Sequence, residues 1–171
     1  VAQAVNPPPR EALVTLTRPN NGTAYTAGDA VSDTSSLVQR VVDLSGYRDQ
    51  TGSILSVRMT VDTANATNGT FRIFFFKDSL NLNNIADNAA FTYSKVKDSL
   101  LIGVYDLTLV TTGTASSTSA YDTDLTETFF SLTNANTSRR GIWVVGTATG
   151  AWVPNNNGKI KLHVIYRMNR G

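Results

Sequence analysis

Apolar and polar residues alternate along several stretches of this chain, which is the pattern of β-strands that bury one face. In residues 53–63 every second side chain is apolar: Leu55, Val57, Met59 and Val61. Residues 159–168 repeat the pattern with Ile160, Leu162, Val164, Tyr166 and Met168. This period of two predicts a strand at each place, with its apolar side chains turned toward a common core.

The stretch 69–78 is different because both of its faces are apolar. An extended chain places Phe71, Ile73 and Phe75 on one side and Arg72, Phe74 and Phe76 on the other. Aromatic and β-branched residues favour strands, and the run is shorter than a typical helix. We therefore predict an interior sheet strand. The loop before it ends in Asn68-Gly69, a turn signal that predicts a hairpin with the preceding strand.

Further strands are predicted at residues 11–17, 37–44, 100–110, 127–132 and 141–147, which brings the total to eight or nine. Gly103 marks a candidate bulge. Residues 80–93 carry apolar side chains at near-helical spacing and predict a short helix or an elaborated loop. Crossover helices of the kind that parallel strands need are missing from the pattern, so a parallel sheet is excluded.

The expected fold is all-β, a single-domain antiparallel β-sandwich of jelly-roll type. Its predicted core contains Leu55, Val57, Met59, Phe71, Ile73, Phe75, Leu162 and Val164. Residues 1–10 are expected to form an extended N-terminal arm and residues 11–171 the sandwich, because Pro7, Pro8 and Pro9 fix an extended conformation without backbone donors. A chain of 171 residues suits one domain.

The net charge of +2 conceals an uneven distribution. After residue 138 the chain has six basic residues and no acidic one. Such polarity predicts an acidic partner or a neighbouring subunit on the basic side. Together with the arm and Arg18, the basic residues form the candidate interface: Pro7, Pro8, Pro9, Arg10, Arg18, Arg139, Arg140, Lys159, Lys161, Arg167 and Arg170. A solvated strand face is the alternative for any single residue.

Nucleic acid is not expected as a partner, because it calls for a denser basic patch with stacking aromatics. A membrane is not expected either. The longest apolar runs fall short of a membrane span, and the N-terminus lacks the basic-then-apolar layout of a signal peptide. The expectation is a soluble protein made in the cytoplasm of its host.

Residue types that carry catalysis or bind metals are scarce. His163 is the only histidine, cysteine is absent, and the sequence has no Gly-x-Ser-x-Gly turn, so neither a catalytic triad nor a zinc site is predicted. Asp122, Asp124 and Glu127 are spaced closely enough to bind calcium, with a solvated turn as the alternative. A carboxylate pair of glycosidase type is not excluded by sequence. We expect no enzyme activity and no cofactor.

Trp143 and Trp152 leave two interpretations open. Exposed and coplanar, they would form a platform on which a sugar stacks; buried, they would fill the core or an interface. The first interpretation corresponds to a carbohydrate-binding module or the receptor-binding tip of a phage tail fibre.

The segment from Arg18 to Val31 combines Arg-Pro, Thr-Ala-Tyr and Ala-Gly-Asp-Ala-Val. It resembles the opening of small β-sandwich proteins encoded among the head genes of tailed bacteriophages, and residues 54–61, 141–145 and 159–166 are similar in style. The resemblance implies a capsid decoration (cement) protein, a non-enzymatic part of the virion that binds the outer surface of the head and stabilises capsomer contacts. It also implies the major capsid protein as partner and a homotrimer as the assembly state.

Overall fold

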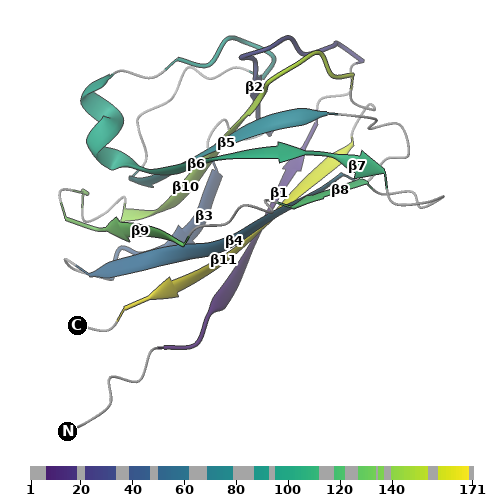
Figure 1. Cartoon of the computed structure of the whole chain (residues 1–171). Helices are drawn as coiled ribbons and strands as arrows, with labels where there is room; N and C mark the ends of the chain where they lie inside the picture. Colours follow the sequence, from purple (N-terminus) through teal and green to yellow (C-terminus); the bar gives the residue numbers. More distant parts are fainter. Residues whose placement is uncertain are drawn as a thin grey trace, which may run out of the picture.

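The computed structural model describes twelve stretches of the chain: residues 7–18, 22–33, 39–46, 50–61, 69–78, 87–92, 95–111, 118–121, 127–133, 135–136, 140–153 and 158–169. Nearly all the regular structure in them is β-strand, arranged as two antiparallel sheets that face each other (Figure 1). The exception is a short 3-10 helix, η1 (Lys95–Leu100). Among the described residues there is no helix with the length and hydropathy of a membrane-spanning segment.

Each sheet is defined by its strand order. The first sheet contains, in order, β1 (Arg10–Thr17), β11 (Lys159–Met168), β4 (Thr51–Val61), β8 (Thr118–Tyr121) and β7 (Val110–Thr111), with β9 (Thr128–Ser131) also paired to β4. The second sheet contains β2 (Ala30–Val31), β10 (Arg140–Ala148), β5 (Thr70–Asp78) and β6 (Leu101–Thr108), with β3 (Gln39–Asp43) also paired to β10.

The strand pairs are nested along the chain. β1 pairs with β11, β3 with β10, β4 with β8 and β9, and β5 with β6. The first strand therefore pairs with the last, and the pairs move inward until they meet at β5 and β6. A long antiparallel ribbon wrapped into two sheets has this order, which is that of a jelly roll. The predicted fold class is confirmed.

The core lies between the two sheets. Seven of the eight predicted core residues are buried: Val57, Met59, Phe71, Ile73, Phe75, Leu162 and Val164. The prediction for Leu55 is wrong, because it is only partly buried and Ile54 is 0% exposed in its place. Opposite β11 the register shifts, so that Ser56 faces Ile165 but Ile54 faces Tyr166. Leu55 is thus the extra residue of a β-bulge, which reverses the alternation.

The predicted hairpin of β4 and β5 is also wrong. β4 lies in the first sheet beside β11, whereas β5 lies in the second sheet between β10 and β6. Each strand has an apolar face. Two such faces can be buried in either of two ways, by packing against each other across a sandwich core or by lying side by side in one sheet. The Asn68-Gly69 signal is local and does not distinguish these arrangements. Asn68 itself lies outside the described residues.

β5 is an interior strand, as its two apolar faces predict. Its register with β6 shifts beside Gly103, because Phe75 faces Gly103 and Phe76 faces Leu101. The bulge predicted at Gly103 is therefore present, with Ile102 as the extra residue. A Cβ on Gly103 would lie 3.0 Å from Cγ2 of Thr128, so the Thr128 side chain would have to shift to accommodate a larger residue.

The predicted helix or loop at residues 80–93 falls mostly outside the described residues. Its described part, residues 87–92, forms a turn and one isolated bridge, Asp29 to Ala90. The remaining predicted strands are found with their ends displaced by at most two residues. The strand predicted at residues 100–110 is divided into β6 and β7.

Candidate assembly surface

The interior of the sandwich is filled by its own side chains. A cavity between the sheets measures only about 20 Å³ and is lined by apolar residues that include Leu16, Met59, Phe71 and Leu162. Such a space holds at most one water, and its walls offer that water few polar partners. The described strands thus leave no room for a ligand between the sheets, and the candidate sites lie on their outward sides.

β11 presents basic side chains on the outward side of the first sheet. Its residues alternate strictly, with the even-numbered side chains buried and the odd-numbered ones exposed or partly exposed. We call the outward side of β1, β11 and β4 the basic face, defined by Leu13, Arg58, Lys159, Lys161, His163, Ile165 and Arg167. The regular period of β11 is what places three of the predicted interface residues, Lys159, Lys161 and Arg167, on one surface.

Arg58 adds a basic residue that the sequence did not single out. In the antiparallel register His163 lies opposite Leu13 of β1 on one side and opposite Arg58 of β4 on the other. Directly opposed residues point to the same face, with Cβ atoms about 5 Å apart. Arg58 was missed because it lies before residue 138, outside the basic C-terminal part of the chain. The signal that identifies it is its place in the polar series Ser56, Arg58, Thr60.

His163 interacts with a carboxylate on this face. Its Nδ1 lies 2.7 Å from Oε1 of Glu11, and the two side chains are 25% and 58% exposed. The histidine is therefore partly exposed on the polar side of β11. An exposed pair of this kind contributes little to stability.

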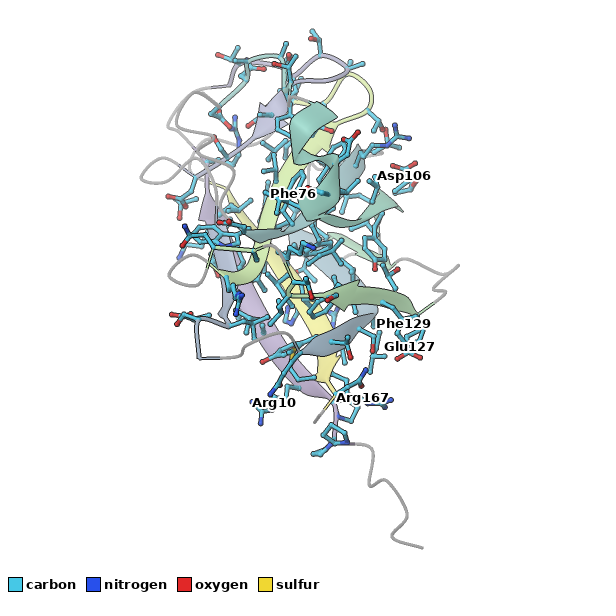
Figure 2. The ribbon with its side chains drawn as sticks, turned by 90° about the vertical axis from the view of Figure 1, so that its left-hand side faces the viewer. Arg10, Phe76, Asp106, Glu127, Phe129 and Arg167 are labelled. Atoms are coloured by element: carbon cyan, nitrogen blue, oxygen red, sulfur yellow. The ribbon has the colours of Figure 1, made fainter. Side chains whose placement is uncertain are left out.

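Two large apolar side chains extend the face. Leu13 is 54% exposed and Phe129 of β9 is 69% exposed. Phe129 lies opposite Ser53, which in turn lies opposite Arg167, so the register places all three on the same side of the sheet. Figure 2 shows Phe129 and Glu127 side by side at one edge of the molecule, above Arg167. Leu13 lies directly opposite His163, and Phe129 is separated from Arg167 only by Ser53, so each exposed apolar side chain adjoins the basic face.

The proline segment leads into the edge of this sheet. Pro7 is partly buried, whereas Pro8, Pro9 and Arg10 are exposed. Residues 7–9 continue from the lower end of β1 (Figure 1). The end of the proline segment that joins β1 thus lies next to the basic face.

Arg18 lies elsewhere, inside the protein. Its side chain is 1% exposed, its Nη1 forms an ion pair with Asp87, and its guanidinium carbon lies 4.2 Å from the centre of the Tyr25 ring. Asp87 also accepts hydrogen bonds from Tyr25 Oη at 2.8 Å and from Ser32 N at 3.1 Å. Burial lowers the pKa of Arg18 and raises the pKa of Asp87, while their pairing opposes both shifts. Asp87 therefore ties the end of β1, through Arg18, to the residues on either side of β2.

Arg140 is internal as well. It is 6% exposed, and its Nε donates a hydrogen bond of 3.1 Å to the carbonyl oxygen of Ala135. Arg139 and Arg170 lie outside the described residues. The structure thus places Lys159, Lys161 and Arg167 on one face of β11. Arg167 lies at the end near residues 7–9, whereas Lys159 lies at the other end, opposite Thr17. Arg18 and Arg140 are buried.

The two tryptophans do not form a coplanar exposed platform. Trp152 is 3% exposed, stacks on Tyr25 at 5.5 Å and meets the edge of Phe71 at 4.9 Å. Trp143 is partly buried in a second apolar cluster, on the outward side of the second sheet. The interpretation in which the tryptophans fill the core is therefore correct for Trp152.

Of the three acidic residues considered for calcium, Asp122 and Asp124 lie outside the described residues. Glu127 is exposed and accepts a hydrogen bond of 2.5 Å from Ser53 Oγ. In the part of the chain that the structure describes, no group of three or more acidic or histidine side chains is placed to hold a metal ion.

No protein-family model matches the sequence. No curated protein matches it at a significant level. Among solved structures, the chain is similar to one from the cyanophage Pam1 capsid asymmetric unit, with 15% identity, a TM-score of 0.38, and coverage of 98% of this chain and 89% of that one. It is also similar to a structure of tomato aspermy virus, with 11% identity, a TM-score of 0.35, and coverage of 100% of this chain and 82% of that one. A third similar structure is that of desmodium yellow mottle tymovirus, with 10% identity, a TM-score of 0.30, and coverage of 99% of this chain and 92% of that one. Similarity at this level establishes neither a shared family nor a shared function.

Proposed function

We propose that this chain is a non-enzymatic structural protein of a virus particle, and more narrowly a capsid decoration (cement) protein on the outer surface of a tailed-bacteriophage head. Its partners would be the major capsid protein and further copies of itself, as a trimer. The observation that carries the proposal is the basic face with its exposed apolar side chains, presented by a jelly roll whose described strands fill the space between the sheets.

The filled interior favours this function over others that the jelly roll supports. This fold occurs in viral capsid proteins, lectins and cupins. A cupin uses the space between its sheets, which apolar side chains occupy here. A lectin built on the two tryptophans would need them exposed, and Trp152 is buried. The similarity of residues 18–31 to phage head proteins points in the same direction.

The basic face is suited to an acidic, partly apolar partner surface. Lys159, Lys161 and Arg167 would steer the protein toward such a surface, an effect that weakens as salt rises. Leu13 and Phe129 are 54% and 69% exposed and would be covered on contact. The arm of residues 1–10 would lie along the capsid or a neighbouring copy. Its prolines hold it extended beforehand, so that docking orders fewer backbone torsions.

The experiment is a binding assay on head shells that lack the protein. A Lys159→Gln, Lys161→Gln variant removes two positive charges from the basic face. A Thr92→Glu, Thr108→Glu variant changes the net charge equally at exposed positions outside that face. We expect the lysine variant to bind shells at least about tenfold more weakly at low salt and the control to bind like the wild type. Equal binding by all three proteins at every salt concentration would contradict the proposal.

A further inference from the structure

The outward side of the second sheet carries a groove that the proposed function does not use. It has a volume of about 510 Å³ and opens to solvent where β5 and β10 meet the loop before β2. The residues that decide its chemistry are Gly28, Arg72, Phe74, Phe91 and Thr149. Its volume is within the range of about 300–1,000 Å³ that is usual for small-molecule sites.

One wall of the groove is aromatic. The rings of Phe74 and Phe91 lie 5.2 Å apart at 52° to each other, and both side chains are partly exposed. Backbone hydrogen bonds fix this wall to the floor, because Phe91 N donates to Gly28 O at 2.9 Å and Gly28 N donates to Ala148 O at 2.8 Å. Gly28 has a φ of 92°, a conformation that other residues rarely adopt. The wall is therefore preformed.

The other side holds Arg72, whose charge is balanced by Asp106 just beyond the lining residues. Arg72 Nε and Nη2 donate to the two carboxylate oxygens of Asp106 at 2.7 and 2.8 Å. The hydrogen bond from Arg72 lowers the pKa of Asp106, and the hydrogen bond to Asp106 raises the pKa of Arg72, so both stay charged at neutral pH. The side chains are 48% and 62% exposed. Figure 2 shows Asp106 at the outer margin of the molecule, far from Arg10 and Arg167.

We propose that this groove binds a neutral oligosaccharide. A pyranose ring has an apolar C–H face, which matches the aromatic wall, and hydroxyl groups that both donate and accept, which match the paired guanidinium and carboxylate. A ligand of net charge would meet opposite charges that already neutralise each other. A wholly apolar ligand would cover the Arg72–Asp106 pair without satisfying its remaining hydrogen-bonding capacity.

The test is a titration of the full chain, by calorimetry and amide NMR shifts, with neutral tetrasaccharides of glucose, mannose and galactose. Sialyllactose, a heparin tetrasaccharide and an apolar hexapeptide serve as comparison ligands. We expect saturable binding of at least one neutral tetrasaccharide, with shifts confined to the groove. A Thr149→Trp variant would fill the groove from an exposed position, and Asp106→Asn would unbalance the pair. Each should weaken binding at least about tenfold. Thr15→Trp, exposed on β1, is the matched control and should bind normally.

The proposal is overturned if no neutral tetrasaccharide binds below about 10 mM, or if a charged sugar or the peptide binds more tightly than all of them. It is also overturned if Thr149→Trp, shown to be folded by circular dichroism, binds as the wild type does. Shell binding by Thr149→Trp separates this site from the proposed virion role. The two functions use opposite sheets, so that variant should decorate shells normally.

Discussion

The outward faces of the two sheets differ in what covers them. On β11 the outward series contains Lys159, Lys161 and Arg167, and it faces solvent. On β5 the outward series contains Phe74 and Phe76, and Phe76 is 0% exposed. The side chains that pack around these two rings are Ala30, Phe91, Leu100, Leu101, Trp143 and Val145. Figure 2 shows Phe76 enclosed near η1, whereas Arg10, Phe129 and Arg167 lie at the outside of the molecule.

The sequence pattern of each strand agrees with this difference in how the outward faces are covered. Strict alternation in β11 corresponds to one buried and one open face, and the doubly apolar run in β5 corresponds to two covered faces. The chain thus covers the part of the second sheet around Phe76 with its own residues, while the groove beside Arg72 stays open. The outward side of the first sheet is left available to a partner. The predictions below test this division.

The largest effect is expected for Phe76→Ala. Truncating a fully buried aromatic side chain costs about 3–5 kcal/mol of unfolding free energy, because it removes buried apolar area and leaves a cavity. Ile165→Ala, on the basic face, is the matched apolar truncation and should cost less than half as much. Urea unfolding followed by tryptophan fluorescence measures both. Equal losses would mean that the two outward faces are not differently covered.

Removing the carboxylate of Asp87 should cost about 3 kcal/mol, because it leaves the guanidinium of Arg18 buried without its counter-charge. An Asp87→Leu variant tests this by thermal and urea unfolding. The double variant Arg18→Met, Asp87→Leu removes both charges and should recover most of the loss. If the double variant is less stable than the single one, the pair is not what makes Asp87 important.

Deleting residues 1–9 should change attachment without changing stability. Pro7 is partly buried and Pro8 and Pro9 are exposed, and we expect the thermal midpoint to move by less than about 2 °C. Occupancy on shells should fall several-fold if the arm contacts the capsid or a neighbouring copy. Intact and truncated proteins are compared at low and high salt. Identical occupancy under both conditions would assign the arm no role in attachment.

The smallest effect is expected for Asp106→Asn on stability. The ion pair with Arg72 is half exposed, and such pairs contribute at most about 1 kcal/mol. The pKa of Asp106 is lowered in the folded protein, so its contribution is present above the carboxyl group's usual pKa and is lost as pH falls through the lowered value. Unfolding free energies at neutral and acidic pH should therefore converge for variant and wild type as pH falls. A difference that grows on acidification would contradict this sign.

The local pattern of apolar and polar residues predicted much of the fold. Each feature that it predicted wrongly has a specific physical cause. Alternation located β11 and most of β4, but the bulge at Leu55 depends on the register with β11, which a single strand does not encode. The Asn68-Gly69 signal predicted a hairpin, whereas the partners of β4 and β5 are chosen by long-range packing. In the candidate site, period two placed Lys159, Lys161 and Arg167 on one face. It did not reveal that Arg18 is buried, because its partner Asp87 is distant in sequence.

The most direct measurement is a cryo-electron microscopy reconstruction of shells saturated with the purified protein. The proposed role predicts ordered density for the domain on the outer surface, with β1, β11 and β4 turned toward the capsid or a sister subunit. It also predicts three copies around each binding site, with Phe129 covered. Isolated single copies would contradict the trimer. Attachment through β5 and β6 with the basic face left in solvent, or no density on the shells at all, would contradict the account itself.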